Sequence, residues 1–271
     1  MKMQNGVCLK YKEFSPFFQS ENAVIYNGDC LEILRSIPEK SVNMIFADPP
    51  YMLSNDGITC KSGKMSNVNK GKWDKSKGFE DDTAFHNEWI SACRTVLKPD
   101  GTIWISGTYH SIYQCGFLLQ KNNFHILNDI AWLKPNAPPN LSCRFFTASH
   151  ETLIWARSDK NARHTFNYKD LKDGFFPEDK LKKENTQMRS VWSIPSPKND
   201  EKKYGKHPTQ KPLDLIRRIV LASTNEGDIV LDPFCGSGTT GVACKDLNNR
   251  FFIGIEIDKG YCEMAKKRIE Y

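Results

Sequence analysis

The segment Ile229-Val230-Leu231-Asp232-Pro233-Phe234-Cys235-Gly236-Ser237-Gly238-Thr239-Thr240 joins two predicted elements and indicates the architecture of the whole chain. Its first three residues are apolar and predict a buried strand, and a helix is predicted from Thr239 to Leu247. Between them, Gly236 and Gly238 allow the backbone to approach a ligand closely, because neither has a Cβ atom. The segment therefore predicts a nucleotide-type loop, although a merely tight strand-to-helix connection is the alternative.

Two further features restrict the class of ligand that this loop can bind. The loop is not a phosphate-binding P-loop, because Thr239 stands where such a loop has lysine, and it lacks the third glycine of the dinucleotide fingerprint. Glu256 lies 18 residues beyond Gly238, at the end of the predicted strand Phe251 to Ile255. A carboxylate there can accept hydrogen bonds from both hydroxyls of a ribose. The pair predicts an adenosine-containing ligand.

A second motif, Asp48-Pro49-Pro50-Tyr51, follows the predicted strand Val42 to Ala47. The prolines fix φ and supply no amide hydrogen, so their carbonyls are free acceptors in a stiff turn. The Asp48 carboxylate and the Pro49 carbonyl could bind the hydrogens of an amino group on an aromatic base and favour a pyramidal, nucleophilic nitrogen. Tyr51 offers a flat face for stacking on the base. The alternative is an ordinary strand exit in which Asp48 caps a turn.

Strand-like and helix-like runs alternate along most of the chain. Such alternation predicts an α/β fold, with a parallel sheet covered on both faces and ligands beyond the carboxyl ends of its strands. Both motifs occupy that kind of position. We expect one catalytic domain over residues 1–271. The predicted strands are Ala23 to Tyr26, Val42 to Ala47, Thr102 to Ser106, Ile126 to Leu133, Glu151 to Ala156, Ile229 to Leu231 and Phe251 to Ile255.

Two basic regions lack a helix or strand period. Residues 52–80 are predicted to be a flexible basic loop, in which Lys61 to Lys77 holds six lysines against the single acid Asp74. Residues 157–205 are polar, basic and interspersed with aromatic residues, and we interpret them as an inserted recognition region. Such clusters are often loops exposed to solvent. The more specific interpretation is that they bind a polyanion.

The overall composition is that of a globular protein, with 39% hydrophobic residues, 26% charged residues and a net charge of +6. No two of the nine cysteines have the two-residue gap of a zinc ribbon or redox motif, which predicts reduced thiols. The amino terminus lacks a signal-peptide pattern, and no run approaches the roughly 20 apolar residues that span a membrane. We therefore expect a cytoplasmic protein without membrane contact.

Taken together, the tetrad at Asp48, the loop from Asp232 to Thr240 and the segment His207-Pro208-Thr209-Gln210-Lys211-Pro212 resemble the amino-methylating DNA methyltransferases. The tetrad precedes the cofactor loop, as in the circularly permuted β class of that family. The resemblance implies a Rossmann-like class I methyltransferase fold with a mostly parallel, seven-stranded sheet. It also implies S-adenosylmethionine as the methyl donor, no metal, DNA as the partner, and a homodimer.

The resemblance also implies roles for individual residues. Asp29 would contact the cofactor adenine and Glu256 its ribose, while His207, Thr209 and Lys211 would lie around the methionine end. Asp48, where some members have serine, favours adenine over cytosine. The implied catalytic residues are Asp48, Pro49, Pro50 and Tyr51. The implied cofactor-binding residues are Asp29, Cys30, His207, Thr209, Lys211, Asp232, Phe234, Gly236, Ser237, Gly238, Thr239 and Glu256.

Closer similarity is found in Trp132 to Asn136, Leu141 to Arg144 and Glu151 to Ala156, which look like the Dpn-type adenine methylases that modify GATC, including the member that accepts single-stranded DNA. The implied activity is site-specific N6 methylation of adenine in a restriction-modification system, by base flipping and direct in-line transfer. Methylation of the cytosine N4 or of an RNA base stays open, as does a non-catalytic nucleic-acid-binding protein. The candidates for base or phosphate contacts are Arg144, Arg163 and Arg189.

Overall fold

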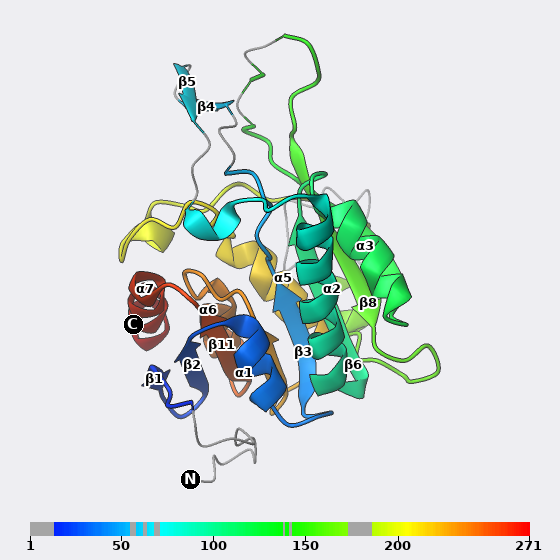
Figure 1. Cartoon of the computed structure of the whole chain (residues 1–271). Coiled ribbons are helices and arrows are strands. Elements are labelled where there is room, and N and C mark those ends of the chain that lie inside the picture. The colour runs from blue at the N-terminus through cyan, green and yellow to red at the C-terminus, as the bar shows by residue number, and fades with distance from the viewer. Residues whose placement is uncertain are drawn as a thin grey trace.

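The computed structural model describes residues 14–54, 58–61, 64–67, 71–137, 139–140, 143–172 and 186–271. Parts of the predicted basic loop (55–57, 62–63 and 68–70) and of the predicted recognition region (173–185) lie outside the described residues. The described part has three layers, in which helices cover both faces of one large sheet (Figure 1).

The large sheet is mixed but mostly parallel, in the order β1-β2-β11-β10-β3-β6-β8-β7-β9. The five strands from β2 to β6 in this order are parallel neighbours, whereas β8 runs antiparallel to β6 and β7. The strands are β1 (Phe18–Gln19), β2 (Ala23–Asn27), β3 (Val42–Ala47), β6 (Leu97–Gly107), β7 (His125–Leu133), β8 (His150–Arg157), β9 (Val191–Ser193), β10 (Ile229–Asp232) and β11 (Phe251–Glu256).

The predicted α/β class is confirmed, but the predicted seven strands are wrong, because the sheet has nine strands within the described residues. The two additional strands, β1 and β9, are the edges of the sheet and contain only two and three residues. Backbone pairing with β2 and β7 defines them. Runs this short cannot display the alternation by which a sequence reveals a strand.

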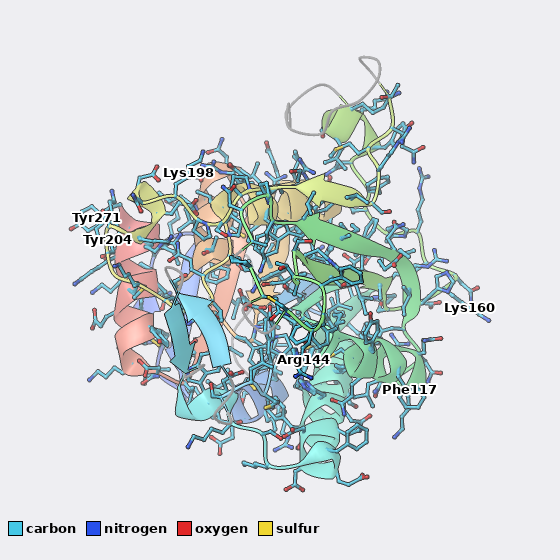
Figure 2. All side chains as sticks on the ribbon, turned by 90° about the horizontal axis from the view of Figure 1, so that it is seen from above. Phe117, Arg144, Lys160, Lys198, Tyr204 and Tyr271 are labelled. Carbon is cyan, nitrogen blue, oxygen red and sulfur yellow. The ribbon has the colours of Figure 1, made fainter. Side chains whose placement is uncertain are left out.

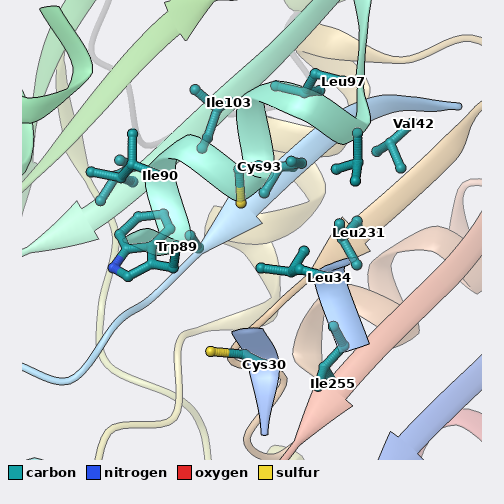
Figure 3. Close-up of a cluster of buried hydrophobic side chains, with 14 of the residues drawn as sticks. Cys30, Leu34, Val42, Trp89, Ile90, Cys93, Leu97, Ile103, Leu231 and Ile255 are labelled. Atoms are coloured by element: carbon teal, nitrogen blue, oxygen red, sulfur yellow. The ribbon is translucent and has the colours of Figure 1, made fainter. Parts of the chain in front are cut away.

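Among the described residues, three longer helices pack on each face of the sheet. Most of them bury an apolar stripe at helical spacing, whereas α6 buries small residues. One face carries α1 (Cys30–Ser36), α2 (Phe79–Val96) and α3 (Ile112–Lys121). In α2, for example, Trp89, Ile90 and Cys93 are fully buried against the sheet (Figure 3). The other face carries α5 (Leu213–Ser223), α6 (Thr239–Asp246) and α7 (Lys259–Glu270), with the short α4 (Tyr168–Lys172) beside α5.

The region 52–80 is not free of regular structure, which corrects the sequence prediction. Within it, β4 (Ile58–Lys61) and β5 (Lys64–Asn67) form an antiparallel pair, η1 spans Lys72–Asp74, and α2 already begins at Phe79. Within the part of the chain that the structure describes, these two strands pair with each other and with no further strand. Because that pairing uses backbone groups, it needs no apolar face and leaves no hydrophobic period in the sequence. A second 3-10 helix, η2, spans Asp200–Lys202.

The sheet order brings distant motifs to one edge. Strand β3 lies directly beside β10, so the tetrad after Ala47 and the glycine loop after Asp232 leave adjacent strands at their carboxyl ends. Strand β11 pairs in parallel with β2, and the last pair is Glu256 with Asn27. Four segments that are far apart in sequence therefore meet at the position where parallel sheets bind ligands.

Two simpler expectations concern thiols and membranes. None of the seven cysteines for which the structure describes a side chain forms a disulfide. In the part of the chain that the structure describes, no helix combines the length and apolar character that membrane crossing requires.

Candidate active site

A cavity of about 580 Å³ opens at the carboxyl edge of the sheet, between the tetrad, the glycine loop and α2. Its volume is within the range of small-molecule sites. The predicted site residues that line it are Asp29, Cys30, Asp48, Pro50, His207, Thr209, Phe234, Gly236 and Glu256. Residues of the tetrad and of the glycine loop therefore line one shared cavity.

The glycine turn is built around the Glu256 carboxylate. Gly236 and Gly238 have φ values of 52° and 76°, in the left-handed region that favours glycine. The Gly236 N–H donates to Glu256 Oε2 at 2.7 Å, and the Asp258 N–H donates to Oε1 at 2.8 Å. Burial raises the pKa of Glu256, while these two N–H groups oppose the rise. Each oxygen retains a lone pair for a further donor such as a ribose hydroxyl.

Other predicted loop residues lie behind the turn and hold its shape. Asp232 accepts hydrogen bonds from the Phe234 N–H at 3.0 Å and the Thr240 hydroxyl at 2.6 Å. Burial raises the pKa of Asp232 to about 7, although both hydrogen bonds lower it. The buried Arg268 guanidinium donates to the Ser237 carbonyl at 2.8 Å. The predicted residues Asp232, Ser237, Gly238 and Thr239 do not line the main cavity and border a small adjoining pocket or the turn itself.

The other wall of the cavity begins at the amino terminus of α1. Asp29 is the N-cap and accepts hydrogen bonds from the Leu31 and Glu32 N–H groups at 2.8 and 3.2 Å. Cys30 follows on the cavity side, and burial, reinforced by Asp29, raises the pKa of its thiol to about 12. The thiol is therefore neutral at physiological pH and is a packing surface rather than a nucleophile.

The tetrad belongs to a buried charged network. The Tyr51 hydroxyl donates to Asp48 Oδ1 at 2.6 Å, and the Lys211 ammonium donates to Asp48 Oδ2 at 2.5 Å. Glu151 is 3.1 Å from the Tyr51 hydroxyl and 3.6 Å from the Lys211 ammonium, and it also forms an ion pair with Lys134. Both oxygens of Asp48 therefore have donors before any substrate arrives.

Electrostatics within the network favour the ionised Glu151. Burial raises the pKa of this carboxyl, but Lys211 and Lys134 outweigh burial and lower the pKa to about 2. Burial lowers the pKa of Lys211, and the two carboxylates outweigh it and raise the pKa, so the ammonium stays charged. For Asp48, burial raises the pKa and Lys211 opposes that rise.

Two predicted site residues, Tyr51 and Lys211, do not line the main cavity. Tyr51 is buried, and its ring does not line the main cavity. Lys211 reaches Asp48 with its side chain, while its carbonyl accepts a hydrogen bond from the Thr239 hydroxyl at 3.4 Å. It therefore links the tetrad to the glycine loop. His207 lies against Gly236, where an added Cβ would come within 3.2 Å of its ring.

Sequence reasoning missed a carboxylate that fixes the tetrad loop. Asp74 is fully buried and accepts hydrogen bonds from the N–H groups of Tyr51, Met52 and Leu53 and from the Ser54 hydroxyl, over 2.8 to 3.3 Å. Its only sequence signal was its position as a single acid in a lysine-rich segment. The adjacent Trp73 lines the cavity and stacks on His207, with 6.2 Å between ring centroids.

The cavity is lined by more negative than positive charge. Among the described residues, six carboxylates line it against two lysines, and three of the six come from α2, which the sequence did not connect with the site. Such a lining suits a cationic ligand. Within the described residues, no group of three or more His, Cys, Asp or Glu side chains is placed to hold a metal ion. The α2 carboxylates are Asp81, Asp82 and Glu88.

The Glu151 pKa predicts a pH dependence of stability. Because the folded pKa of about 2 lies below the ordinary 4.5, the carboxylate stabilises the fold above that ordinary value and loses this effect as the pH falls. Between about pH 5 and pH 2, wild type should lose about 3 kcal/mol more unfolding free energy than Glu151→Gln. Urea denaturation of both proteins at each pH measures this, and parallel pH profiles would contradict the assigned ion pairs.

The sheet order, the glycine turn and the shared cavity are those of a Rossmann-like α/β protein that binds a ligand at the carboxyl ends of its strands. The sequence matches the DNA methylase family over residues 42–267, and the chain belongs to that family. It is 49% identical to the Type II methyltransferase M2.DpnII of Streptococcus pneumoniae over 259 residues, spanning 94% of this chain and 92% of that protein. It is 48% identical to the Type II methyltransferase M2.MboI of Moraxella bovis over 257 residues, spanning 93% and 90%.

Solved structures agree with the fold. The crystal structure of the M1.HpyAVI–SAM complex aligns with a TM-score of 0.66 at 33% identity, covering 92% of this chain and all of that chain. The cytosine-N4-specific PvuII DNA methyltransferase aligns with a TM-score of 0.70 at 19% identity, covering 94% and 89%. The second likeness concerns the fold alone.

Proposed function

We propose that this protein is a Type II DNA methyltransferase that transfers a methyl group from S-adenosylmethionine to the N6 of adenine in a short duplex site, GATC. The observation that carries this proposal is the single cavity shared by the Asp48 carboxylate, the glycine turn and Glu256. Membership of the DNA methylase family and near-full-length similarity to Type II methyltransferases support it.

The residues around the cavity fit the proposed donor, which supplies an electrophilic methyl group on a cationic sulfur when bound. Glu256 would hold the ribose hydroxyls, and Asp29 lies beside it for the adenine. The turn at Gly236 leaves room for close approach of the ligand, and the excess of carboxylates favours a positive charge. His207 and Thr209 line the same cavity as Asp48.

The tetrad would position the target adenine. The Asp48 carboxylate and the Pro49 carbonyl accept the hydrogens of the amino group and stabilise the positive charge that develops on the nitrogen. Reaction then depends mainly on positioning the nitrogen in line with the methyl group. For Tyr51 to stack on an extruded base, its buried ring must turn out and its hydroxyl must leave Asp48. That movement would free one Asp48 oxygen for the substrate.

The proposal is tested with purified protein, tritiated S-adenosylmethionine and duplex oligonucleotides that contain either GATC or the same bases in scrambled order. Mass spectrometry of the digested product should detect N6-methyladenine only in the GATC duplex. N4-methylcytosine, or labelling of RNA alone, would overturn the proposed base or substrate. A single-stranded GATC oligonucleotide in the same assay tests whether single strands are accepted.

Glu256 provides a test of the donor site that does not depend on turnover. In Glu256→Gln the amide NH₂ would face a backbone N–H of Gly236 or Asp258, and one acceptor for a ribose hydroxyl would be lost. We expect the dissociation constant for S-adenosylmethionine, measured by calorimetry, to rise about tenfold or more. The exposed Glu270→Gln is the matched control. Equal affinities in wild type and Glu256→Gln would contradict the assigned ribose contact.

Two further proposals depend on the resemblance to the β class. A homodimer is expected, and sedimentation of the purified protein should give twice the mass of the chain. We also place the protein in the cytoplasm, where its proposed DNA substrate is found, and fractionation of expressing cells measures this.

A further inference from the structure

The loop between β7 and β8 is anchored in the catalytic network. It leaves β7 at Lys134 and enters β8 at His150, on the end of the sheet where the strands from β2 to β6 have their carboxyl termini (Figure 1). At its base the Lys134 N–H donates to the Ser149 carbonyl at 2.8 Å, and the Lys134 side chain pairs with Glu151. Since Glu151 contacts the Tyr51 hydroxyl, the position of this loop is tied to the tetrad.

The tip of the loop presents two phenylalanines to solvent. Phe145 is 67% exposed and Phe146 is 97% exposed. Leaving an aromatic ring in water forgoes the free energy of burial, and soluble proteins seldom expose two adjacent ones without a reason. Arg144, beside them, is also exposed. Seen from above, Arg144 lies over the body of the protein, whereas Phe117 lies at the periphery (Figure 2).

Local hydrogen bonds hold this tip in a defined shape. The Asn140 side-chain amide donates to the Phe145 carbonyl at 2.7 Å, and the Asn140 N–H donates to the Thr147 hydroxyl at 3.1 Å. The Cys143 N–H donates to the Asn140 carbonyl at 3.3 Å, and Cys143 has a φ of 52°. Asn140 therefore holds the Phe145 carbonyl and the Thr147 hydroxyl, which lie on the two sides of Phe146 in sequence.

We propose that Arg144, Phe145 and Phe146 form a DNA wedge, in which Phe146 enters the base stack beside the target adenine and Arg144 binds an adjacent phosphate. This inference rests on the proposed function and deepens it. An extruded base leaves a gap in the duplex, and a flat apolar ring can fill that gap and so favour extrusion. At its base the loop is tied through the Lys134–Glu151 ion pair to Tyr51 of the tetrad that would receive the base.

The test compares Phe146→Ala with wild type, using Phe117→Ala on α3 as the matched control for loss of an exposed ring. On a fully paired GATC duplex, kcat/KM of Phe146→Ala should fall about tenfold or more, because base stacking on an aromatic ring is lost. On a duplex with an abasic site opposite the target adenine, and on a single strand if wild type accepts one, the variant should approach wild type. Phe117→Ala should match wild type on every substrate.

A fluorescent base gives a readout that does not require methyl transfer. With 2-aminopurine in place of the target adenine, wild type should raise its fluorescence on binding, and Phe146→Ala should raise it less at saturating protein. An equal loss of activity on paired and abasic duplexes, or unchanged kinetics, would overturn the wedge. If Phe146→Ala sediments with a lower mass than wild type, the rings instead belong to a contact between two chains. If wild type methylates no adenine at all, the proposed function is wrong. If Phe146→Ala is as active as wild type, the wedge alone is wrong and the proposed function stands.

Discussion

Replacing Asp48 with alanine is expected to reduce methyl transfer by about a thousandfold or more, since it removes the acceptor that stabilises charge on the attacking nitrogen. Affinity for S-adenosylmethionine should change little, because Asp48 forms only one part of the cavity wall. Single-turnover kinetics with tritiated donor measure the first effect, and calorimetry measures the second. Asp48→Asn, which keeps one carbonyl oxygen but places an amide beside the Lys211 ammonium, should be similarly impaired.

The matched control for this variant is Asp100→Ala. Asp100 is exposed and lies near the start of β6, at the opposite end of the sheet from the cavity. It should retain wild-type turnover. If Asp48→Ala and Asp100→Ala both transfer methyl groups at near-normal rates, Asp48 has no role in the reaction.

Replacing Lys211 with methionine should produce the second large effect. The Lys211 ammonium is the shared partner of Asp48, which is partly buried, and Glu151, which is buried. Without it, Tyr51 and Lys134 are the remaining described partners of these two carboxylates. Breaking a buried pair in this way should lower the unfolding free energy by about 3 kcal/mol. Because the orientation and charge of Asp48 would also change, kcat should fall about a hundredfold.

A second variant separates the two roles of Lys211. In Lys211→Met combined with Glu151→Gln, one of the stranded charges is neutralised, so most of the lost stability should return in urea denaturation. Turnover should stay low, because Asp48 still lacks its ammonium partner. Lys211→Arg, which keeps the charge, should lose less activity than Lys211→Met. Full recovery of turnover in the double variant would mean that Lys211 serves stability alone.

Much of the fold follows from the apolar pattern. The buried strands of the sheet centre contain runs such as Val42–Ala47 and Phe251–Glu256, in which nearly every side chain is buried, and such runs are visible in sequence. The edge strands β1 and β9 and the pair β4 and β5 leave no such pattern, because backbone hydrogen bonds define them. The two missed edge strands account for the difference between seven predicted and nine observed strands.

The site was predictable where its chemistry is encoded within a short motif. Asp48 follows β3, Gly236 lies in the turn after β10, and Glu256 ends β11, so their meeting at one sheet edge follows from the topology. Glu151 and Asp74 both act through contacts with Tyr51, which lies 100 positions before Glu151 and 23 positions before Asp74 in the sequence. No local pattern records such distant pairs. Lys211 was expected beside the cofactor, and only the packing of the folded chain reveals its contact with Asp48.

A crystal structure of the protein with S-adenosylmethionine and a GATC duplex would show whether one cavity holds both reactants. We expect the donor to occupy the cavity with its ribose on Glu256 and its methyl group facing an extruded adenine whose amino nitrogen contacts the Asp48 carboxylate. A donor bound with its methyl group turned away from Asp48, or an adenine seated in a different cavity, would contradict it.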